Sequence, residues 1–347
     1  MVKIFSALLI GFFSLFPNQN MIPAQFRNPN VVTIPSPTPV AEASLTGTQK
    51  NLNNLPLGDN NYVTDKPKKG YIFLCRVMQG EGGAEGQSPW IHGESWNLNA
   101  KPSVNGRILW PIGLFSINTG FNKREISGNG IPVDTQTGIF PIQSSDPVYK
   151  YDKNPNTIYP HSFSLSLPEN PTVLDSPICI QGEVGIMMNG VPLFNGFDAE
   201  NRDAPAHEIQ DSCDGHPQVN GEYHYHSLSR CMKDIKITTV IGYALDGFPI
   251  TGPQLSNENY LSTTDLDECH GMTSEILIDG QKKTMYHYVM TYDFPYSVSC
   301  FRGKPVRMQV IPNNENHDKT NKQPENIRGQ RQLPQEALTA CNGKATA

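Results

Sequence analysis

The side chains best suited to chemistry are the histidines of an alternating stretch, Tyr223-His224-Tyr225-His226. Successive side chains of a β-strand point to opposite faces, so His224 and His226 would share one face, with Tyr223 and Tyr225 on the other. Two imidazoles on one face can bind a single ion, and imidazole is a preferred ligand of both Cu²⁺ and Zn²⁺. A His-x-His tripeptide alone is a weak motif, so the surrounding residues have to support it.

The residues just upstream supply a third imidazole. His216 lies in the segment 211–217 and is followed by the turn dipeptide Asn220-Gly221. Such a turn can reverse the chain, so we expect His216 to approach the same face as the alternating histidines. The pair His207-Glu208 adds another candidate ligand and an acid.

A second copy of this pattern follows downstream. Residues 267–271 echo 211–215, and Tyr286-His287-Tyr288 echoes the first Tyr-His-Tyr, in the same order along the chain. This order suggests an internal repeat. If the two halves pack about a shared axis, His287 faces the first histidine pair. The predicted copper or zinc ligands are therefore His224 and His226, with either His216 or His287. Side chains predicted to orient the ring nitrogens are Tyr223, Tyr225, Asp211 and Asp246.

Nearby carboxylates raise the question of catalysis. Three histidine ligands and one open position would hold a water of lowered pKa, and Glu208 or Glu222 would serve as the base in a hydrolytic or hydration step. The sequence carries no Ser-His-Asp elbow, P-loop or paired-glycine nucleotide motif beside this cluster. Enzymatic activity is therefore left open.

Two alternatives need no metal. Tyrosine-histidine alternation can form a buried polar ladder in which imidazoles bond to Asp211, Asp246 and Asp267. The chain is also a candidate binding module for a glycan or a protein, because three tryptophans within a short stretch could form an aromatic platform. Ordinary core packing is the simpler reading of these tryptophans, which are Trp90, Trp96 and Trp110.

Composition predicts the elements that must position these residues. Charged residues make up 17% of the chain, and it has 29 Gly and 29 Pro, a mix that favours turns and short strands. Short apolar runs alternate with Asn-Gly and Asp-Gly dipeptides, which tolerate hairpin turns. We predict a mainly β fold of antiparallel, sandwich-like sheets with short helices and long loops. The one modest helix candidate is 203–212, with Asp203 as the cap and Pro205 in the first turn.

The ends of the chain differ in composition from its middle. Lys3 and the apolar run 4–16 are typical of a secretion signal, which we place at residues 1–24. A Pro-, Asn- and Thr-rich linker is expected over 25–69, the folded domain over 70–311, and a polar disordered tail over 312–347. Export implies a secreted or periplasmic protein with no membrane anchor after signal cleavage. A net charge of −6 without a basic stripe argues against nucleic-acid binding.

An oxidising compartment changes what the seven cysteines mean, because they would pair rather than bind metal as thiolates. Sequence alone does not determine connectivity. The nearest pairing joins Cys213 to Cys231 and Cys269 to Cys300, which leaves Cys75 for Cys179 and leaves Cys341 unpaired. The domain is therefore expected to be stabilised by disulfides.

Taken together, these motifs resemble the YHYH domain family. The likeness runs through Asn189-Gly190-Val191-Pro192, the segment 211–217, the Tyr-His-Tyr-His stretch, residues 246–250 and the second Tyr-His-Tyr. It covers most of residues 85–303. The resemblance implies an exported domain and assigns no activity to it. The second motif ends in Val289 where a full copy would have histidine, which argues against two equivalent sites.

Overall fold

The computed structural model describes residues 47–78, 80, 84 and 88–310. The predicted signal over 1–24 and the predicted tail over 312–347 lie outside the described residues, as does Cys341. No helix in the described part has the length and apolar character that a membrane crossing requires.

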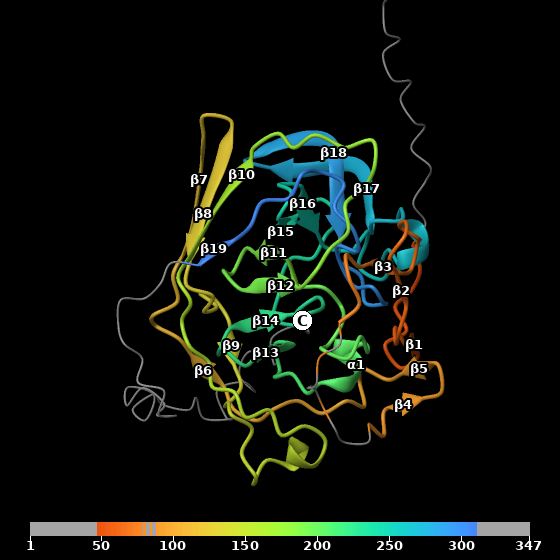
Figure 1. Ribbon diagram of the computed structural model, residues 1–347, viewed down its shortest axis with the longest axis vertical. Helices are drawn as coiled ribbons and strands as arrows, with labels where there is room; N and C mark the ends of the chain where they lie inside the picture. The colour runs from red at the N-terminus through yellow and green to blue at the C-terminus, as the bar shows by residue number, and fades with distance from the viewer. Residues whose placement is uncertain (1–46, 79, 81–83, 85–87, 311–347) are drawn as a thin grey trace, which may run out of the picture. The chain divides into compact units, whose positions relative to one another are not determined.

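The described part is mainly β, as predicted, and its largest sheet has eight strands (Figure 1). The strands of this sheet are β11 (Glu183–Met187), β12 (Pro192–Phe194), β13 (Gly215–Pro217), β14 (Tyr223–Tyr225), β15 (Val240–Ala244), β16 (Pro249–Thr251), β17 (Gly271–Ile278) and β18 (Gln281–Val289). An antiparallel four-stranded sheet contains β7 (Phe115–Gly120), β8 (Lys123–Gly128), β10 (Phe163–Pro168) and β19 (Gln309–Val310).

Shorter strands and helices complete the described part. The short strands are β1 (Leu55–Pro56), β2 (Tyr62–Val63), β3 (Ile72–Phe73), β4 (Ile91–His92), β5 (Ser95–Trp96), β6 (Ile108–Leu109) and β9 (Gln136–Thr137). The helices are α1 (Ala204–His207) and two 3-10 helices, η1 (Pro147–Lys150) and η2 (Thr263–Asp265). Helix α1 lies inside the predicted segment 203–212 but has only one turn. Asp203 caps it, and Pro205 lies in its first turn, as expected.

The eight-stranded sheet consists of two copies of one four-stranded unit. Its strand order is β13-β14-β12-β11-β15-β16-β18-β17, and the two units join through the antiparallel pair β11–β15. Counted outward from this junction, each unit begins with two antiparallel strands. The strand that comes fourth in the sequence of the unit, β14 or β18, lies next and runs parallel to the second, β12 or β16. The third, β13 or β17, lies at the outer edge. The predicted repeat is therefore present, and the resulting sheet is mixed rather than purely antiparallel.

Side-chain contacts repeat together with the strands. Asp211 Oδ1 accepts hydrogen bonds from the backbone N–H groups of Cys213 and Gly215, at 2.8 and 3.3 Å, and Asp211 Oδ2 accepts the hydroxyl of Tyr223 at 2.9 Å. In the second unit, Asp267 accepts from Cys269, Gly271 and Tyr286 at 2.9, 2.9 and 3.2 Å. Each aspartate thus fixes the turn that leads into an outer strand.

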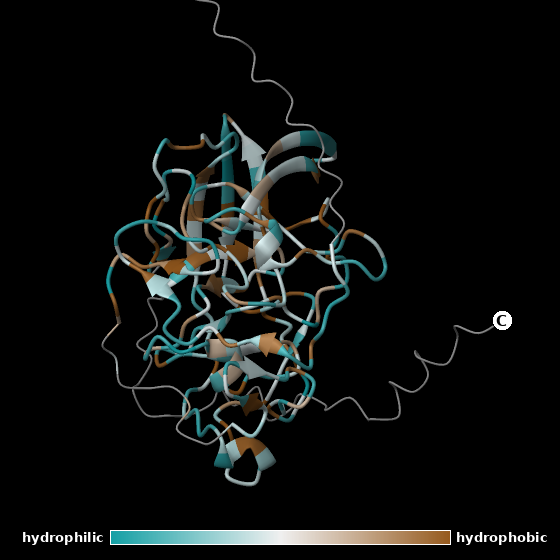
Figure 2. Cartoon of the chain, turned by 90° about the vertical axis from the view of Figure 1, so that its right-hand side faces the viewer, coloured by the Kyte–Doolittle hydropathy of each residue, from teal (hydrophilic) through white to brown (hydrophobic). Residues whose placement is uncertain are grey.

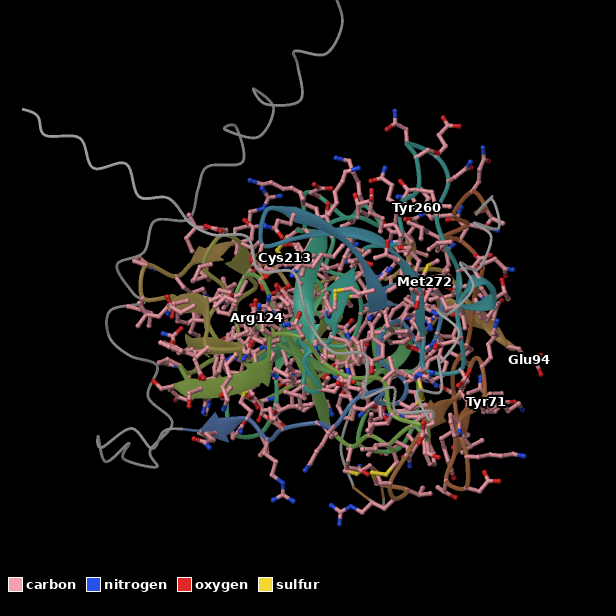
Figure 3. All side chains as sticks on the ribbon, turned by 90° about the horizontal axis from the view of Figure 1, so that it is seen from above. Tyr71, Glu94, Arg124, Cys213, Tyr260 and Met272 are labelled. Carbon is pink, nitrogen blue, oxygen red and sulfur yellow. A yellow bond between two sulfur atoms is a disulfide. The ribbon has the colours of Figure 1, made fainter. Side chains whose placement is uncertain are left out.

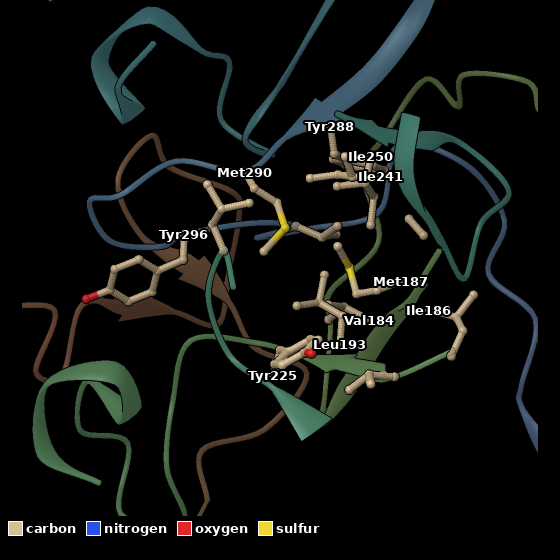
Figure 4. Packing of buried hydrophobic residues seen from close by; sticks show 14 of the residues in the cluster. Val184, Ile186, Met187, Leu193, Tyr225, Ile241, Ile250, Tyr288, Met290 and Tyr296 are labelled. Atoms are coloured by element: carbon tan, nitrogen blue, oxygen red, sulfur yellow. The ribbon is translucent and has the colours of Figure 1, made fainter. Parts of the chain in front are cut away.

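The hydrophobic core lies against this sheet. In Figure 2, hydrophobic residues, drawn in brown, lie on strands in the middle of the described part, and many outer loops are hydrophilic. Tyr223 and Tyr225 are fully buried on the face opposite to the histidines, as strand alternation predicts. Figure 4 shows Tyr225 beside Leu193 and Val184 in the packed interior. The tyrosines therefore serve as core residues that orient strand β14.

The four-stranded sheet contacts the eight-stranded sheet at a buried arginine. Arg124 of β8 lies between them (Figure 3): its guanidinium lies 4.4 Å from the ring centre of Tyr243 on β15. Arg124 also bonds to Asp279 in the β17–β18 turn at 2.6 Å. A buried arginine needs such a partner, because an isolated charge in the interior is costly.

Residues 47–69 differ from the solvated linker predicted for 25–69. Strand β1 pairs with β5, β2 pairs with β3, and Leu55 is only 5% exposed. Asp59 in this segment lies 2.9 Å from the ring of His207 at the end of α1. The segment is polar on average, but a few apolar side chains are enough to dock it. The remaining linker residues, 25–46, lie outside the described part.

The three predicted cysteine pairs are all present, as Cys75–Cys179, Cys213–Cys231 and Cys269–Cys300. The three tryptophans do not form the aromatic platform that the sequence suggested, because Trp90 and Trp96 are 1% exposed and Trp110 is 9% exposed. The indole of Trp90 donates to the carbonyl of Ala206 in α1 at 2.8 Å. These tryptophans are core residues.

Replacing Ile250 by alanine tests the core of the second unit. Ile250 lies on β16 and is fully buried, so the substitution should lower the free energy of unfolding by about 2–5 kcal/mol through lost contacts and a residual cavity. The matched control is Leu277→Ala on β17, where the side chain is 53% exposed and the loss should be within about 0.5 kcal/mol. Urea denaturation measures both, and equal losses would contradict the assigned core.

Candidate metal centre

Strand register brings three histidines to one face of the first unit. His216 on β13 is the direct register partner of His224 on β14, and His226 follows two residues later on the same face. The ring centroids are 4.6 Å apart for His216 and His224, 4.8 Å for His224 and His226, and 5.3 Å for His216 and His226. One ring nitrogen from each histidine lies within 4.8 Å of the others. This cluster is called the histidine triad below.

Backbone carbonyls orient two of these rings. His224 Nδ1 lies 3.1 Å from the carbonyl oxygen of Glu222, and His226 Nδ1 lies 2.6 Å from that of Asn195. A carbonyl oxygen can only accept a hydrogen bond, so each Nδ1 has to carry the proton. The two Nε2 atoms then present lone pairs, and they face each other at 3.0 Å.

No neutral form of this pair satisfies all its nitrogens. If His224 carried its proton on Nε2 to bond to His226, its Nδ1 lone pair would face the Glu222 carbonyl instead. Either tautomer leaves two lone pairs in contact. A cation between the Nε2 atoms removes this repulsion.

The third histidine and an adjacent acid have free polar atoms. Neither ring nitrogen of His216 has a hydrogen-bond partner among the described residues, although the residue is 3% exposed. Glu208 Oε2, also buried and unbonded, lies 3.4 Å from His216 Nε2 and 3.7 Å from His226 Nε2. Buried polar atoms normally find partners, and here several atoms without a protein partner are gathered at one point.

Helix α1 places Glu208. The helix ends at His207, and Glu208 continues in extended conformation toward the triad. Asp203 at the start of α1 accepts the hydroxyl of Tyr296 at 2.7 Å, and Trp90 holds the carbonyl of Ala206. The short helix is therefore fixed at both ends by buried partners.

Burial sets the protonation of the triad. It lowers the pKa of His224 to about 3 and of His226 to about 4, and it lowers the pKa of His216 well below its ordinary value. Neighbouring imidazoles add to the shift for His216 and His224. The rings are thus neutral at pH 7, the form that binds metals. Burial, with repulsion from Asp198 and Asp152, raises the pKa of Glu208 well above its usual range.

A cavity of about 650 Å³ opens onto the triad. All three histidines and Glu208 line it. Phe194 on the neighbouring strand β12 forms part of the wall, with its ring centroid 4.3 Å from that of His224. Small-molecule sites commonly measure about 300–1,000 Å³, so the triad lies in a space of the size that a ligand requires.

His287 does not join the triad, although the sequence left it as an alternative ligand. It lies on β18, five strand spacings from β14, or about 24 Å at the usual spacing. The two units join through β11–β15, so equivalent positions lie toward opposite ends of the sheet. His287 is also satisfied, with Nδ1 2.9 Å from Thr251 Oγ1 and Nε2 2.8 Å from Ser274 Oγ.

The other predicted site residues have different roles. Glu222 does not line the cavity; its carboxylate accepts from Gln218 at 2.5 Å, and its carbonyl orients His224. The predicted orienting side chains, Asp211, Asp246, Tyr223 and Tyr225, contact none of the triad nitrogens. Asp246 instead accepts the hydroxyl of Tyr288 at 2.6 Å. Sequence reasoning missed the carbonyl of Asn195, although its turn dipeptide Asn195-Gly196 marks where β12 ends beside the triad.

The depressed pKa values predict how the metal-free protein responds to acid. In the unfolded chain His226 takes up a proton below about pH 6.5, whereas in the folded protein its pKa is about 4. The free energy of unfolding therefore falls as the pH is lowered through this window. His226→Asn keeps an N–H donor for Asn195 and removes the titrating ring. As the pH falls, the free energy of unfolding of the wild type should therefore decrease relative to that of the variant by up to about 1.4 kcal/mol per pH unit.

Urea unfolding in the presence of a chelator, at half-unit steps from pH 7 to pH 4, measures this difference. Buried carboxyls with raised pKa values, such as Asp211, change stability in the opposite direction, but both proteins contain them. A difference that does not change between pH 6.5 and pH 4 would contradict a neutral buried ring.

Comparison with known proteins supports the resemblance drawn from the sequence. The family described as YHYH protein matches residues 164–259. This segment contains the whole first unit of the sheet, the triad and Glu208, and it ends before β17 and His287. No curated protein and no solved structure matched the chain. The recognition of a YHYH-type region is thereby confirmed, and the match brings no activity with it.

Proposed function

We propose that His216, His224 and His226 of this YHYH-type region bind a Cu²⁺ or Zn²⁺ ion. The observation that carries the proposal is the contact between His224 Nε2 and His226 Nε2 at 3.0 Å, with both Nδ1 atoms committed to carbonyl oxygens. A shared ion converts this repulsive contact into two bonds.

A proton is the other cation that could lie between the rings. Burial opposes it, because the pKa values of both rings are lowered far below 7. A metal ion is held by three lone pairs at once, whereas a proton serves two. His216, with both nitrogens unbonded, supplies the third.

The donor set fits either ion. Tetrahedral coordination with zinc–nitrogen bonds of about 2.0–2.1 Å separates two ligand nitrogens by about 3.3 Å. The triad nitrogens, 3.0 Å apart for the closest pair and within 4.8 Å for all, need only small movements to reach this geometry. Six cysteines form disulfides and therefore offer no thiolate ligand, so the donors at the triad are imidazoles. Such an ion, held by His216, His224 and His226, would supply Lewis-acid chemistry at the cavity.

The polar-ladder alternative describes other histidines better. His287 bonds to two hydroxyls, and His270 Nε2 lies 3.0 Å from Thr291 Oγ1. The aspartates once expected to hold the triad bond to tyrosines and backbone N–H groups instead. The triad therefore differs from the satisfied buried histidines of the same molecule.

Metal binding is tested by elemental analysis and calorimetric titration of purified protein. Wild type should bind one equivalent of Zn²⁺ or Cu²⁺, and His224→Asn should weaken binding by at least about 100-fold, because it keeps the Nδ1-type donor but removes the ligand atom. His287→Ala, at the equivalent position of the second unit, is the matched control and should bind like wild type.

The same variants report the effect of the ion on stability. Metal at about 100 times its Kd should raise the free energy of unfolding by about 2.7 kcal/mol in wild type and in His287→Ala. In His224→Asn, whose Kd should be at least about 100-fold higher, the rise should be at most about 0.4 kcal/mol. Equal metal content in the two variants, or an absence of metal from a folded wild type, would contradict the proposal.

A metal-dependent hydrolase or hydratase is the second candidate function. It is favoured by Glu208, whose unbonded Oε2 lies within 3.7 Å of two triad nitrogens and lines the cavity. There the carboxyl can hold or accept a proton from a molecule that enters the open position. Glu222, the other predicted base, does not line the cavity.

Glu208→Gln distinguishes binding from catalysis. The metal-loaded wild type would be assayed with an activated ester, a phosphate ester and bicarbonate. If one of them is turned over, Glu208→Gln should lower kcat by about 10²–10⁴ while metal content stays at one equivalent. Glu222→Gln serves as the control and should keep its activity. Absence of turnover of every substrate would reject this candidate and leave a non-catalytic metal centre.

We also propose that the chain is exported to an oxidising compartment, secreted or periplasmic. Three disulfides support this proposal, since such bonds persist where thiols are not kept reduced. A glycan or protein ligand remains a further candidate partner, but the buried tryptophans do not supply its binding surface.

A further inference from the structure

The cavity above the triad has a polar wall whose acidic groups are already engaged. Asp152 accepts from the backbone N–H groups of Asn154 and Ile209, at 2.8 and 2.9 Å. Asp198 accepts from its own loop and from the guanidinium of Arg202 at 2.8 Å. Both carboxylates hold loops in place, and the guanidinium of Arg202 balances the charge of Asp198. Glu208 is the carboxyl of the wall that is left for a ligand.

Positive charges at the same cavity are free. Lys150 and Lys153 line it, both are exposed, and neither forms an ion pair among the described residues. The Lys150 ammonium lies 4.6 Å from the ring centre of Tyr151. With a divalent ion held by three imidazoles, the positive charges at the cavity would outnumber its three carboxylates.

Part of the cavity wall is apolar. Leu74 and Phe197 are 1% and 6% exposed, and Phe194 packs against the ring of His224. Gln181 Oε1, which is buried and unbonded, adds one polar contact in this part of the cavity. A ligand in this space therefore meets apolar side chains as well as positive charge.

We infer that the cavity binds a small organic carboxylate, with its carboxylate group at the triad metal and an apolar body between Phe194, Phe197 and Leu74. This inference rests on the proposed metal centre. It assigns a ligand class to the open position that faces the cavity. Lys150 and Lys153, which are exposed and line the cavity, attract the anion, and Glu208, whose unbonded Oε2 lies within 3.7 Å of two triad nitrogens, is the polar side chain beside it.

The full chain loaded with Co²⁺ provides the test, because the visible spectrum of this ion reports a change in its ligands. Benzoate is the probe, benzyl alcohol is its neutral counterpart, and inorganic phosphate is an anion without an apolar body. Benzoate should shift the spectrum in a saturable way and bind at least tenfold more tightly than either of the others. The same result is expected in His287→Ala.

The lysines are tested with Lys150→Gln/Lys153→Gln. This double variant should bind Co²⁺ like wild type and weaken benzoate binding by about three- to tenfold, the effect of two partly screened charges. The matched control is Lys282→Gln/Lys283→Gln on β18, which changes the net charge equally and should alter benzoate binding by less than about twofold.

The outcomes separate this inference from the proposed function. If neither Co²⁺ nor Zn²⁺ nor Cu²⁺ binds to the triad, both fail. If Co²⁺ binds but benzoate leaves its spectrum unchanged, only the carboxylate inference fails. If phosphate binds as tightly as benzoate, the ligand does not need an apolar body, and the inference is contradicted. If benzyl alcohol binds as tightly as benzoate, the ligand does not need a negative charge, and the inference is contradicted as well.

Discussion

The contact between the Nε2 atoms of His224 and His226 is the constraint on which the site depends. Two carbonyl oxygens, from Glu222 and Asn195, fix both rings so that their lone pairs point at one another. Such an arrangement costs energy as long as no cation lies between the rings, and burial lowers the pKa of both rings, which opposes a proton there. The proposed metal binding rests on this geometry. Its rigidity comes from backbone groups, which do not depend on side-chain rotamers.

The internal repeat shows what the same scaffold does without this constraint. In the second unit, Met272 stands opposite His287 where His216 stands opposite His224, and Val289 replaces the last histidine of the motif. Thr251, equivalent in position to Phe194, now offers a hydroxyl to the remaining ring. The aspartate-fixed turn and the buried tyrosines are kept in both units. Strand topology and turn contacts therefore belong to the fold, and the triad belongs to one copy only.

Much of the site could be predicted from sequence because strand geometry is local. Alternation alone placed His224 and His226 on one face and the tyrosines on the other, and the Asn220-Gly221 turn brought in His216. The exclusion of His287 could not be predicted, since it follows from which strands join the two units. The choice of Glu208 over Glu222 depends on where α1 ends, and the orienting carbonyl of Asn195 has no side-chain signature. The docking of residues 47–69 was missed because average polarity hides a few buried side chains such as Leu55.

The Cys213–Cys231 bridge encloses all three histidines of the triad in one covalent ring with a sequence separation of 18 residues. Once this bond has formed, the imidazoles stay near one another even in a chain that has lost its sheets. An oxidised, denatured chain thus retains a loose chelating macrocycle, and any affinity it keeps for the ion subtracts from the stabilisation that the ion gives the native state. If the disulfide forms before the ion binds, the three histidines are already held within one covalent ring when the ion arrives. The order of the two events during maturation would therefore affect how the site forms.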